Sequence, residues 1–222
     1  MAVALIVAAG RGERLGSGLP KALVTLGGKP MLEWSVATLH SLPEIEQIVV
    51  ALPADALDAA PAGTVAVAGG AVRSQSVREA LRVSGRGDPV VVHDAARPLA
   101  PAALFADALA QLEACGADAV IAAAPVSDTI KEVENDGRTV ARTLERSRLW
   151  AVQTPQVFRR EALERALLGA DDELLAAATD DAWLIEQVGG TVQVVKSGPR
   201  NIKVTTPTDL QLAELLLAED AR

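Results

Sequence analysis

Apolar and polar positions divide the chain into short strands and amphipathic helices that follow one another in turn. Six short apolar runs are typical of strands that are buried on both faces. They cover residues 3–7, 47–52, 64–68, 89–92, 118–124 and 191–196. Helical spacing of apolar residues predicts helices over residues 30–40, 101–114, 159–168 and 172–177, near 74–77 and from 207 onward. This alternation predicts an α/β fold with a mostly parallel sheet and helices on both faces.

One segment departs from this pattern and reads as a polar β-hairpin. Residues 129–134 and 138–144 alternate in polarity, and an Asn-Asp-Gly turn signal at 135–137 joins them. A hairpin that is polar on both faces is marginally stable alone. A projecting β-arm over residues 127–149 that packs on a second subunit therefore explains the segment better than a surface ornament does.

Composition limits the class of protein. A chain of 222 residues, half of them apolar, fits one domain with a large core. The net charge of −8 argues against binding to nucleic acid or to an anionic membrane. The single cysteine, Cys115, excludes an internal disulfide and fits a reducing cytoplasm. Without a membrane-length apolar run or a signal peptide, we expect one cytoplasmic domain over residues 1–222.

The segment that directly follows the first strand combines glycine with positive charge. Its sequence over residues 8–21 is AAGRGERLGSGLPK. Four glycines free the backbone to approach a ligand, and open α/β sheets bind ligands at the carboxyl ends of strands. Arg11, Arg14 and Lys21 add cations where backbone N–H groups can face an anion. We expect a cradle for a polyphosphate, and the alternative is a glycine-rich turn with solvated charges.

Two familiar glycine motifs do not fit this segment. A dinucleotide fingerprint, G-x-G-x-x-G, fails because Leu15 stands at its third glycine position and the glycine follows at Gly16. A P-loop fails because Lys21 follows Pro20 and precedes Ala22 rather than Ser or Thr. A dinucleotide-dependent oxidoreductase is therefore disfavoured.

The third strand leads into a second candidate loop. Gly69 and Gly70 precede a helix start, where the backbone can approach a ligand and Ser76 offers a hydroxyl and an N–H. The alternative is an ordinary helix start with Ser74 as the N-cap, and both can hold at once.

The fourth strand ends in a candidate metal ligand. Asp94 follows the apolar run 89–92, and Mg²⁺ usually takes one or two protein carboxylates together with phosphate oxygens and water. The alternative, equally weighted from these residues alone, is that Asp94 caps the turn before Pro98.

Seven motifs, taken together, resemble the nucleotidyltransferases that join a nucleoside triphosphate to a sugar or polyol phosphate. H-D-A-A-R-P at 93–98 is distinctive of the branch acting on 2-C-methyl-D-erythritol 4-phosphate and of its relatives acting on ribitol 5-phosphate. The other motifs are the 8–21 segment, G-G-A-V-R-S-Q-S-V at 69–77, P-V-S-D-T-I-K at 125–131, E-R-S-R-L-W with Q-T-P-Q at 145–156, T-D-D-A at 179–182 and N-I-K-V-T at 201–205. Asp181 is a small departure, since relatives commonly carry Glu there.

The resemblance implies a Rossmann-like three-layer fold, a homodimer formed through the β-arm, and transfer of a cytidylyl group from CTP to a polyol phosphate with release of pyrophosphate. It assigns catalysis to Arg14 and Lys21, and binding of Mg²⁺ or another divalent cation to Asp94. Arg146, Thr179 and Lys203 would position the substrate, with Arg146 acting across the subunit boundary. The implied nucleotide-binding residues are Ala8, Ala9, Gly10, Gly12, Gly69, Gly70, Arg73, Ser76 and Ala95.

Alternatives remain for individual residues and for the whole chain. Arg146 could instead be a surface residue paired with Glu145 or Asp136, and Thr179 could be a helix N-cap. The substrate could be ribitol 5-phosphate rather than 2-C-methyl-D-erythritol 4-phosphate. A nucleotide-binding scaffold without catalysis is disfavoured because Arg14, Lys21, Asp94, Arg146 and Lys203 are all present.

Overall fold

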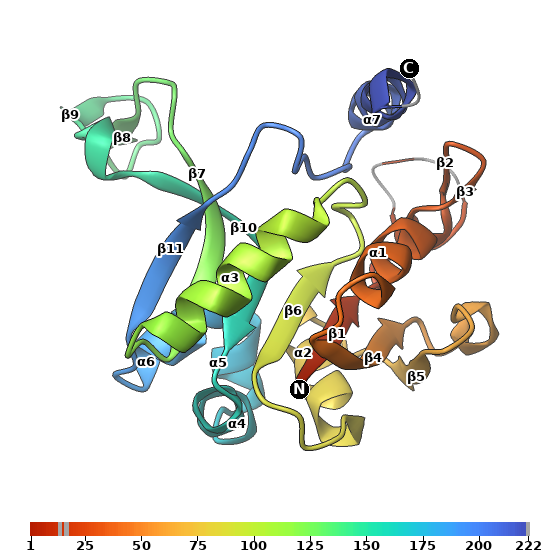
Figure 1. The fold of residues 1–222 in the computed structure, drawn as a ribbon. Coiled ribbons are helices and arrows are strands. Elements are labelled where there is room, and N and C mark those ends of the chain that lie inside the picture. Colours follow the sequence, from red (N-terminus) through yellow and green to blue (C-terminus); the bar gives the residue numbers. More distant parts are fainter. Residues whose placement is uncertain (13–14, 16–17, 221–222) are drawn as a thin grey trace.

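A single central sheet of seven strands organises the molecule, which is a computed structural model describing residues 1–12, 15 and 18–220. The strands are β1 (Ala2–Val7), β4 (Ile45–Leu52), β5 (Val65–Ala68), β6 (Val90–Asp94), β7 (Ala119–Pro125), β10 (Trp150–Phe158) and β11 (Val192–Lys196). Their spatial order is β11-β7-β10-β6-β1-β4-β5 (Figure 1). The six strands predicted from apolar runs are confirmed, with small shifts at their ends.

Strand β10 is the strand of the central sheet that the apolar pattern does not predict. It lies between β6 and β7 and runs antiparallel to both, whereas the other pairings in this sheet are parallel. Its pairing with β7 is interrupted between Val152 and Gln156, where the register shifts. The mostly parallel sheet is confirmed, and β10 is its antiparallel insertion.

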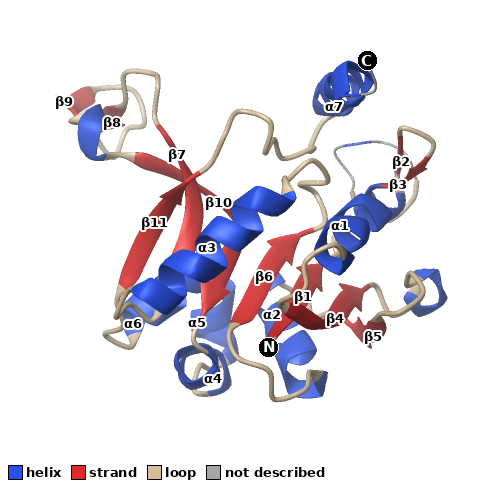
Figure 2. Cartoon of the chain, viewed as in Figure 1, coloured by secondary structure: helices blue, strands red, loops and turns tan. Residues whose placement is uncertain are grey.

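Helices cover both faces of this sheet (Figures 1 and 2). One face carries α1 (Met31–His40) and α3 (Ala102–Ala114). The opposite face carries α2 (Arg73–Val83), α4 (Arg160–Leu168), α5 (Asp172–Ala177) and α6 (Asp181–Gln187). The three-layer α/β architecture is thus confirmed. In the described part of the chain, no helix combines the length and apolar character needed to cross a membrane.

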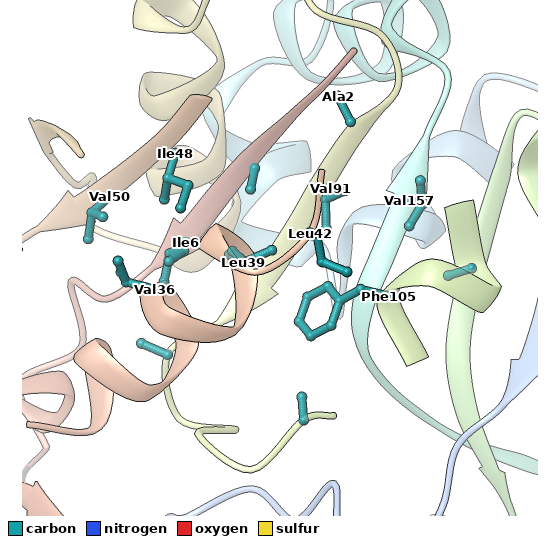
Figure 3. Packing of buried hydrophobic residues seen from close by; sticks show 14 of the residues in the cluster. Ala2, Ile6, Val36, Leu39, Leu42, Ile48, Val50, Val91, Phe105 and Val157 are labelled. Atoms are coloured by element: carbon teal, nitrogen blue, oxygen red, sulfur yellow. The ribbon is translucent and has the colours of Figure 1, made fainter. Parts of the chain in front are cut away.

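Each central strand is buried on both faces, as its continuous apolar sequence requires. In β1, Ala4 and Ile6 point to the face covered by α1 and α3, and Val3 and Leu5 point to the other. Phe105 is a large fully buried side chain on the α1 and α3 face (Figure 3). These cores fix the strand ends at which the candidate loops begin.

The first and last parts of the chain meet in a third, smaller core. The short hairpin of β2 (Thr25–Leu26) and β3 (Lys29–Pro30) packs against α7 (Pro207–Asp220) through Leu26 and Ala213. Between the glycine-rich loop and this hairpin lies η2 (Lys21–Leu23), a 3₁₀ turn. A further 3₁₀ turn, η3, spans Leu57–Ala59.

The predicted arm forms a separate two-stranded sheet that projects from the body (Figures 1 and 2). Its strands are β8 (Lys131–Val133) and β9 (Val140–Thr143), and η4 (Arg146–Arg148) follows them. Val133 and Val140 are register partners, and the two residues are 46% and 53% exposed. The hairpin is confirmed, and it displays an apolar pair that the body of the chain leaves uncovered.

Candidate active site

The segments that follow β1, β5 and β6 meet the segment that carries Lys203 in one cavity of about 210 Å³, at the carboxyl ends of β1 and β6. Because these parallel strands are neighbours, their carboxyl ends lie at one edge of the sheet. The predicted site residues that line the cavity are Ala8, Ala9, Gly10, Lys21, Gly70, Arg73, Ser76, Asp94, Ala95 and Lys203. Gly12 and Gly69 line an adjoining, more open groove.

The glycine-rich loop after β1 folds back onto Lys21. The backbone N–H of Lys21 donates to the carbonyl of Gly10 at 3.0 Å. Gly12 has a φ of 72°, and a Cβ there would lie 3.0 Å from Cα of Lys21. Glycine is therefore required both for the backbone conformation and for this close approach. Arg14 lies outside the described residues, so its role stays a prediction.

The loop between β5 and α2 is fixed by its own serine and packs against the first loop. The hydroxyl of Ser76 accepts from the N–H of Gly70 at 3.1 Å and donates to the carbonyl of Val72 at 3.2 Å. A Cβ added to Gly69 would lie 2.4 Å from Cβ of Ala9. Both loops therefore line the cavity as one closely packed pair.

The start of α2 differs from the expectation that Ser74 is its N-cap. The N-cap is Val72, and Ser74 lies inside the helix, where its hydroxyl donates to the carbonyl of Leu175. This start makes Arg73 the first helical residue and directs its side chain to two carboxylates.

The centre of the cavity is a cluster of four alternating charges. Oδ1 of Asp94 accepts from Nε of Arg73 at 2.9 Å, and Oδ2 accepts from Nζ of Lys203 at 2.7 Å. A terminal nitrogen of Arg73 donates to Oδ2 of Asp181 at 2.6 Å. Asp181 has no exposed surface, whereas the side chain of Lys203 is 44% exposed. The cluster thus extends from the interior to the cavity surface.

These contacts set the protonation states of the cluster. Burial acts to raise the pKa of Asp94, but Arg73 and Lys203 outweigh it and hold the pKa well below its ordinary value. Burial acts to lower the pKa of Arg73, but Asp181 and Asp94 outweigh it and raise the pKa. Burial raises the pKa of Asp181, and Arg73 opposes that rise. Asp94 is therefore an anion at neutral pH.

His93 lies behind Asp94, fully buried, and does not line the cavity. Its Nδ1 is 3.1 Å from the hydroxyl of Thr154, and its Nε2 is 3.2 Å from the carbonyl of Arg97. The same hydroxyl accepts from the N–H of Asp94 at 3.0 Å. These contacts hold the turn that carries Asp94.

A second cavity, of about 320 Å³, shares Arg73, Asp94 and Lys203 with the first. Thr179 lines it, as does Asp180. The expectation that Thr179 is a helix N-cap is wrong, because Asp180 caps α6 by accepting from the N–H of Trp183 at 2.8 Å. Two compartments therefore meet at one charge cluster.

Among the described site residues predicted from the sequence, Arg146 lines neither of the two cavities nor the adjoining groove. It lies in η4 at the base of the arm, where a terminal nitrogen donates to the carbonyl of Ser127 at 2.6 Å. Asp136 and Glu145 accept from other groups in the arm instead, so the expected alternative of a pairing with either is not observed.

The residues at Asp94 fit a divalent cation of the magnesium type. Among the described residues, no three His, Cys, Asp or Glu side chains gather in an all-protein metal site. Mg²⁺ needs no such site when phosphate oxygens and water complete its coordination. One ionised carboxylate at the wall of a cavity lined by glycine loops and lysines suits a cation that enters with a polyphosphate.

Two residues with roles at this site were given no role from the sequence. Asp181 holds Arg73, and Thr154 holds the backbone of Asp94. Asp181 is 108 residues from Arg73 along the chain, so spacing gives no sign of their contact. The matching motifs T-D-D-A and Q-T-P-Q were the available signals, but they do not say which side chains meet.

The fold and this cavity define the protein as a nucleotidyltransferase of the α/β class. The family model described as 2-C-methyl-D-erythritol 4-phosphate cytidylyltransferase matches residues 2–219. A protein of that name from Frankia casuarinae is 49% identical, over 99% of this chain and 84% of its own length. Another from Saccharopolyspora erythraea is 44% identical, over 97% of this chain and 99% of its own. The chain belongs to the 2-C-methyl-D-erythritol 4-phosphate cytidylyltransferase family.

Solved structures agree with this assignment. The crystal structure of 2-C-methyl-D-erythritol 4-phosphate cytidylyltransferase from Thermus thermophilus has a TM-score of 0.82 and 34% identity, and covers 98% of this chain and 100% of its own. A structure of 4-diphosphocytidyl-2C-methyl-D-erythritol synthase from Anaerococcus prevotii has a TM-score of 0.83 and 28% identity, with coverage of 98% and 96%. The resemblance read from the seven motifs is therefore confirmed.

Proposed function

We propose that the chain transfers the cytidylyl group from CTP to 2-C-methyl-D-erythritol 4-phosphate, giving 4-diphosphocytidyl-2-C-methyl-D-erythritol and pyrophosphate. Family membership supports the reaction. The single observation that carries it to this chain is the shared cavity, in which Lys21, Asp94 and Lys203 face one space beside the glycine loops. The proposal includes a cytoplasmic location, which the single cysteine supports.

The reaction needs charge stabilisation more than it needs a base. The attacking phosphate oxygen of the polyol is already an anion, and the neutral His93 is buried away from the cavity. The barrier lies in bringing two anions together while charge builds on the α-phosphoryl oxygens. Lys21 and Arg14 would stabilise that charge. A divalent cation at Asp94, Mg²⁺ by preference, would neutralise the triphosphate when bound.

The two cavities suggest how the substrates divide the site. CTP would occupy the cavity between the glycine loops, with Ala8, Ala9, Gly10, Gly12, Gly69, Gly70, Arg73, Ser76 and Ala95 around it. The polyol phosphate would occupy the second cavity beside Thr179. Lys203 lines both cavities and would hold the incoming phosphate in line with the α-phosphorus.

The homodimer belongs to the same proposal. Arg146 lies outside the cavities of its own chain, and the arm exposes Val133 and Val140. An arm that packs on a second copy would bury this apolar pair and bring Arg146 to the polyol phosphate of that copy. Arg suits the task because its planar guanidinium binds phosphate through two parallel hydrogen bonds.

A co-substrate panel tests the proposed reaction. Pyrophosphate release is measured for CTP, UTP, ATP and GTP, each with 2-C-methyl-D-erythritol 4-phosphate or ribitol 5-phosphate, with Mg²⁺ or with EDTA. We expect turnover with CTP, the methylerythritol phosphate and Mg²⁺. Preferred turnover of ribitol 5-phosphate would replace the substrate, and CTP binding without turnover of either polyol would indicate a non-catalytic scaffold.

A further inference from the structure

Arg73 divides its guanidinium between two different carboxylates rather than gripping one. Its Nε donates to Asp94 at 2.9 Å, and a terminal nitrogen donates to Asp181 at 2.6 Å. The usual strong geometry places two guanidinium nitrogens on the two oxygens of a single carboxylate. Here the second carboxylate draws the guanidinium to one side, and Arg73 reaches only Oδ1 of Asp94.

The buried position of Asp181 lowers the stability of the folded chain. It is fully buried at the first position of α6, and its Oδ1 has no hydrogen-bond partner in the described structure. A buried carboxyl group with one unpaired oxygen costs stability, and an apolar residue could fill the volume at lower cost. Such a group points to a role other than holding the fold together.

The two oxygens of Asp94 differ as a result. Oδ1 faces Arg73, which Asp181 anchors from the interior. Oδ2 faces Lys203, whose side chain is 44% exposed against 28% for Arg73 and has no second carboxylate contact among the described ion pairs. Oδ2 is thus the oxygen whose partner can leave when a cation approaches from the cavity.

We propose that Asp181 is a positioning residue of the active site, which holds Arg73 on Oδ1 of Asp94 and so keeps Oδ2 available to the divalent cation that enters with the nucleotide. Without Asp181, the guanidinium would be free to turn onto both oxygens of Asp94 and compete with the cation. The inference rests on the proposed role of Asp94 as the metal ligand.

The test measures how strongly a divalent cation tightens nucleotide binding. A non-reactive α,β-methylene analogue of CTP is titrated calorimetrically into the full chain with Mg²⁺ and with EDTA. The ratio of the two dissociation constants is the coupling between cation and nucleotide. We expect Asp181→Asn to reduce this ratio by about tenfold or more, whereas affinity in EDTA changes little. Asp181→Glu, which keeps the charge, should recover most of the ratio.

Matched variants separate this role from a structural one. Asp172→Asn also removes a carboxylate that pairs with an arginine, but its side chain is 71% exposed and outside the cavities, so its ratio should equal that of the unaltered chain. Arg73→Lys provides a second route should Asp181→Asn fold poorly, since one ammonium cannot span both carboxylates as the guanidinium does. It should lower the ratio in the same way.

The outcomes distinguish the positioning role of Asp181 from the proposed role of Asp94 as the metal ligand. Asp94→Asn should abolish the tightening by Mg²⁺, and an unchanged ratio in that variant would refute Asp94 as the metal ligand. If Asp94→Asn abolishes the tightening while Asp181→Asn or Arg73→Lys retains it in full, Asp181 is only a structural link between α2 and α6 and the inference is wrong.

Discussion

His93 lies directly behind Asp94 with both ring nitrogens engaged. The N–H of Asp94 donates to the hydroxyl of Thr154, so the hydroxyl proton is available to Nδ1 of the imidazole. Nε2 then carries the ring proton and donates to the carbonyl of Arg97. This arrangement uses the neutral ring, and burial lowers the pKa of His93 to about 4. The residue thus supports the backbone of Asp94 without taking a charge.

The depressed pKa of His93 predicts a loss of stability in mild acid. The unfolded chain binds a proton at His93 below about pH 6.5, whereas the folded chain binds it only below about 4. The free energy of unfolding should therefore fall as the pH drops through this window, by at most about 3 kcal/mol. Urea denaturation at several pH values between 7 and 4 measures the slope.

The matched variant is His93→Gln, which should be less stable at pH 7 but should show a flatter profile between pH 6.5 and 4. Asp94, whose lowered pKa affects stability mainly at more acid pH, and Asp181, whose raised pKa acts in the opposite direction, are present in both proteins. The difference between the two slopes therefore reports on His93. Equal slopes for the two proteins would show that His93 is not the titrating group.

At the scale of elements, the sequence predicts those helices, strands and loops that a local pattern of residues specifies. The parallel strands and long helices follow from apolar spacing, and the glycine loops follow from their positions at strand ends. Strand β10 was not predicted because Gln153, Thr154 and Pro155 interrupt its apolar pattern, and proline argues against an interior strand. The structure accommodates these residues at a register shift in the middle of β10.

The residues at this interruption also include supporting residues of the site that the sequence did not identify. Thr154 supports Asp94, and Gln156 donates to Asp180 at 2.9 Å. Likewise, Asp181 meets Arg73 only because α6 and α2 cover the same face of the sheet. Contacts between distant elements have no local signature, so sequence predicted which residues line the cavity better than which residues hold them in place.

The close packing of the two glycine loops gives a prediction for Gly69. A Cβ there would lie 2.4 Å from Cβ of Ala9 and 2.9 Å from the hydroxyl of Ser76, so the loops must move apart to admit it. Gly69→Ala should lower the free energy of unfolding by about 1–3 kcal/mol, as overpacking does. It should also weaken binding of CTP, measured by calorimetry with the non-reactive analogue.

Gly116 offers the control for that change, since a Cβ there meets no atom within 4 Å. Gly116→Ala should leave both stability and nucleotide binding almost unaltered. Nucleotide binding by Gly69→Ala at the strength of the control would mean that the loops tolerate separation and that their contact does not shape the cavity.

At the scale of the whole molecule, the arm predicts complementation between two inactive chains. Lys21→Ala should inactivate the site of its own chain, and Arg146→Ala should inactivate the site of the partner. A heterodimer of the two keeps one intact site, because the Arg146→Ala chain retains Lys21 and receives Arg146 from the other chain. Random mixing should restore roughly a quarter of the unaltered rate, measured by pyrophosphate release after joint unfolding and refolding.

Either variant alone, refolded in the same way, provides the baseline. If Arg146 served its own chain, the mixture would stay as inactive as the separate variants. Sedimentation of Val140→Lys adds an independent measurement, since a charge in the exposed apolar pair should shift the protein from dimer to monomer.

Helix α7 packs against the β2 and β3 hairpin, although the ribosome makes these two segments at opposite ends of synthesis. A nascent chain exposes its glycine loop early, yet Lys203 and the helix that packs beside the hairpin leave the ribosome much later. Contacts between such distant segments need the whole intervening chain and slow folding, because loop-closure entropy opposes them. A product terminated before residue 203 would therefore lack Lys203 and the part of the cavity wall that it forms, and we expect it to bind CTP more weakly.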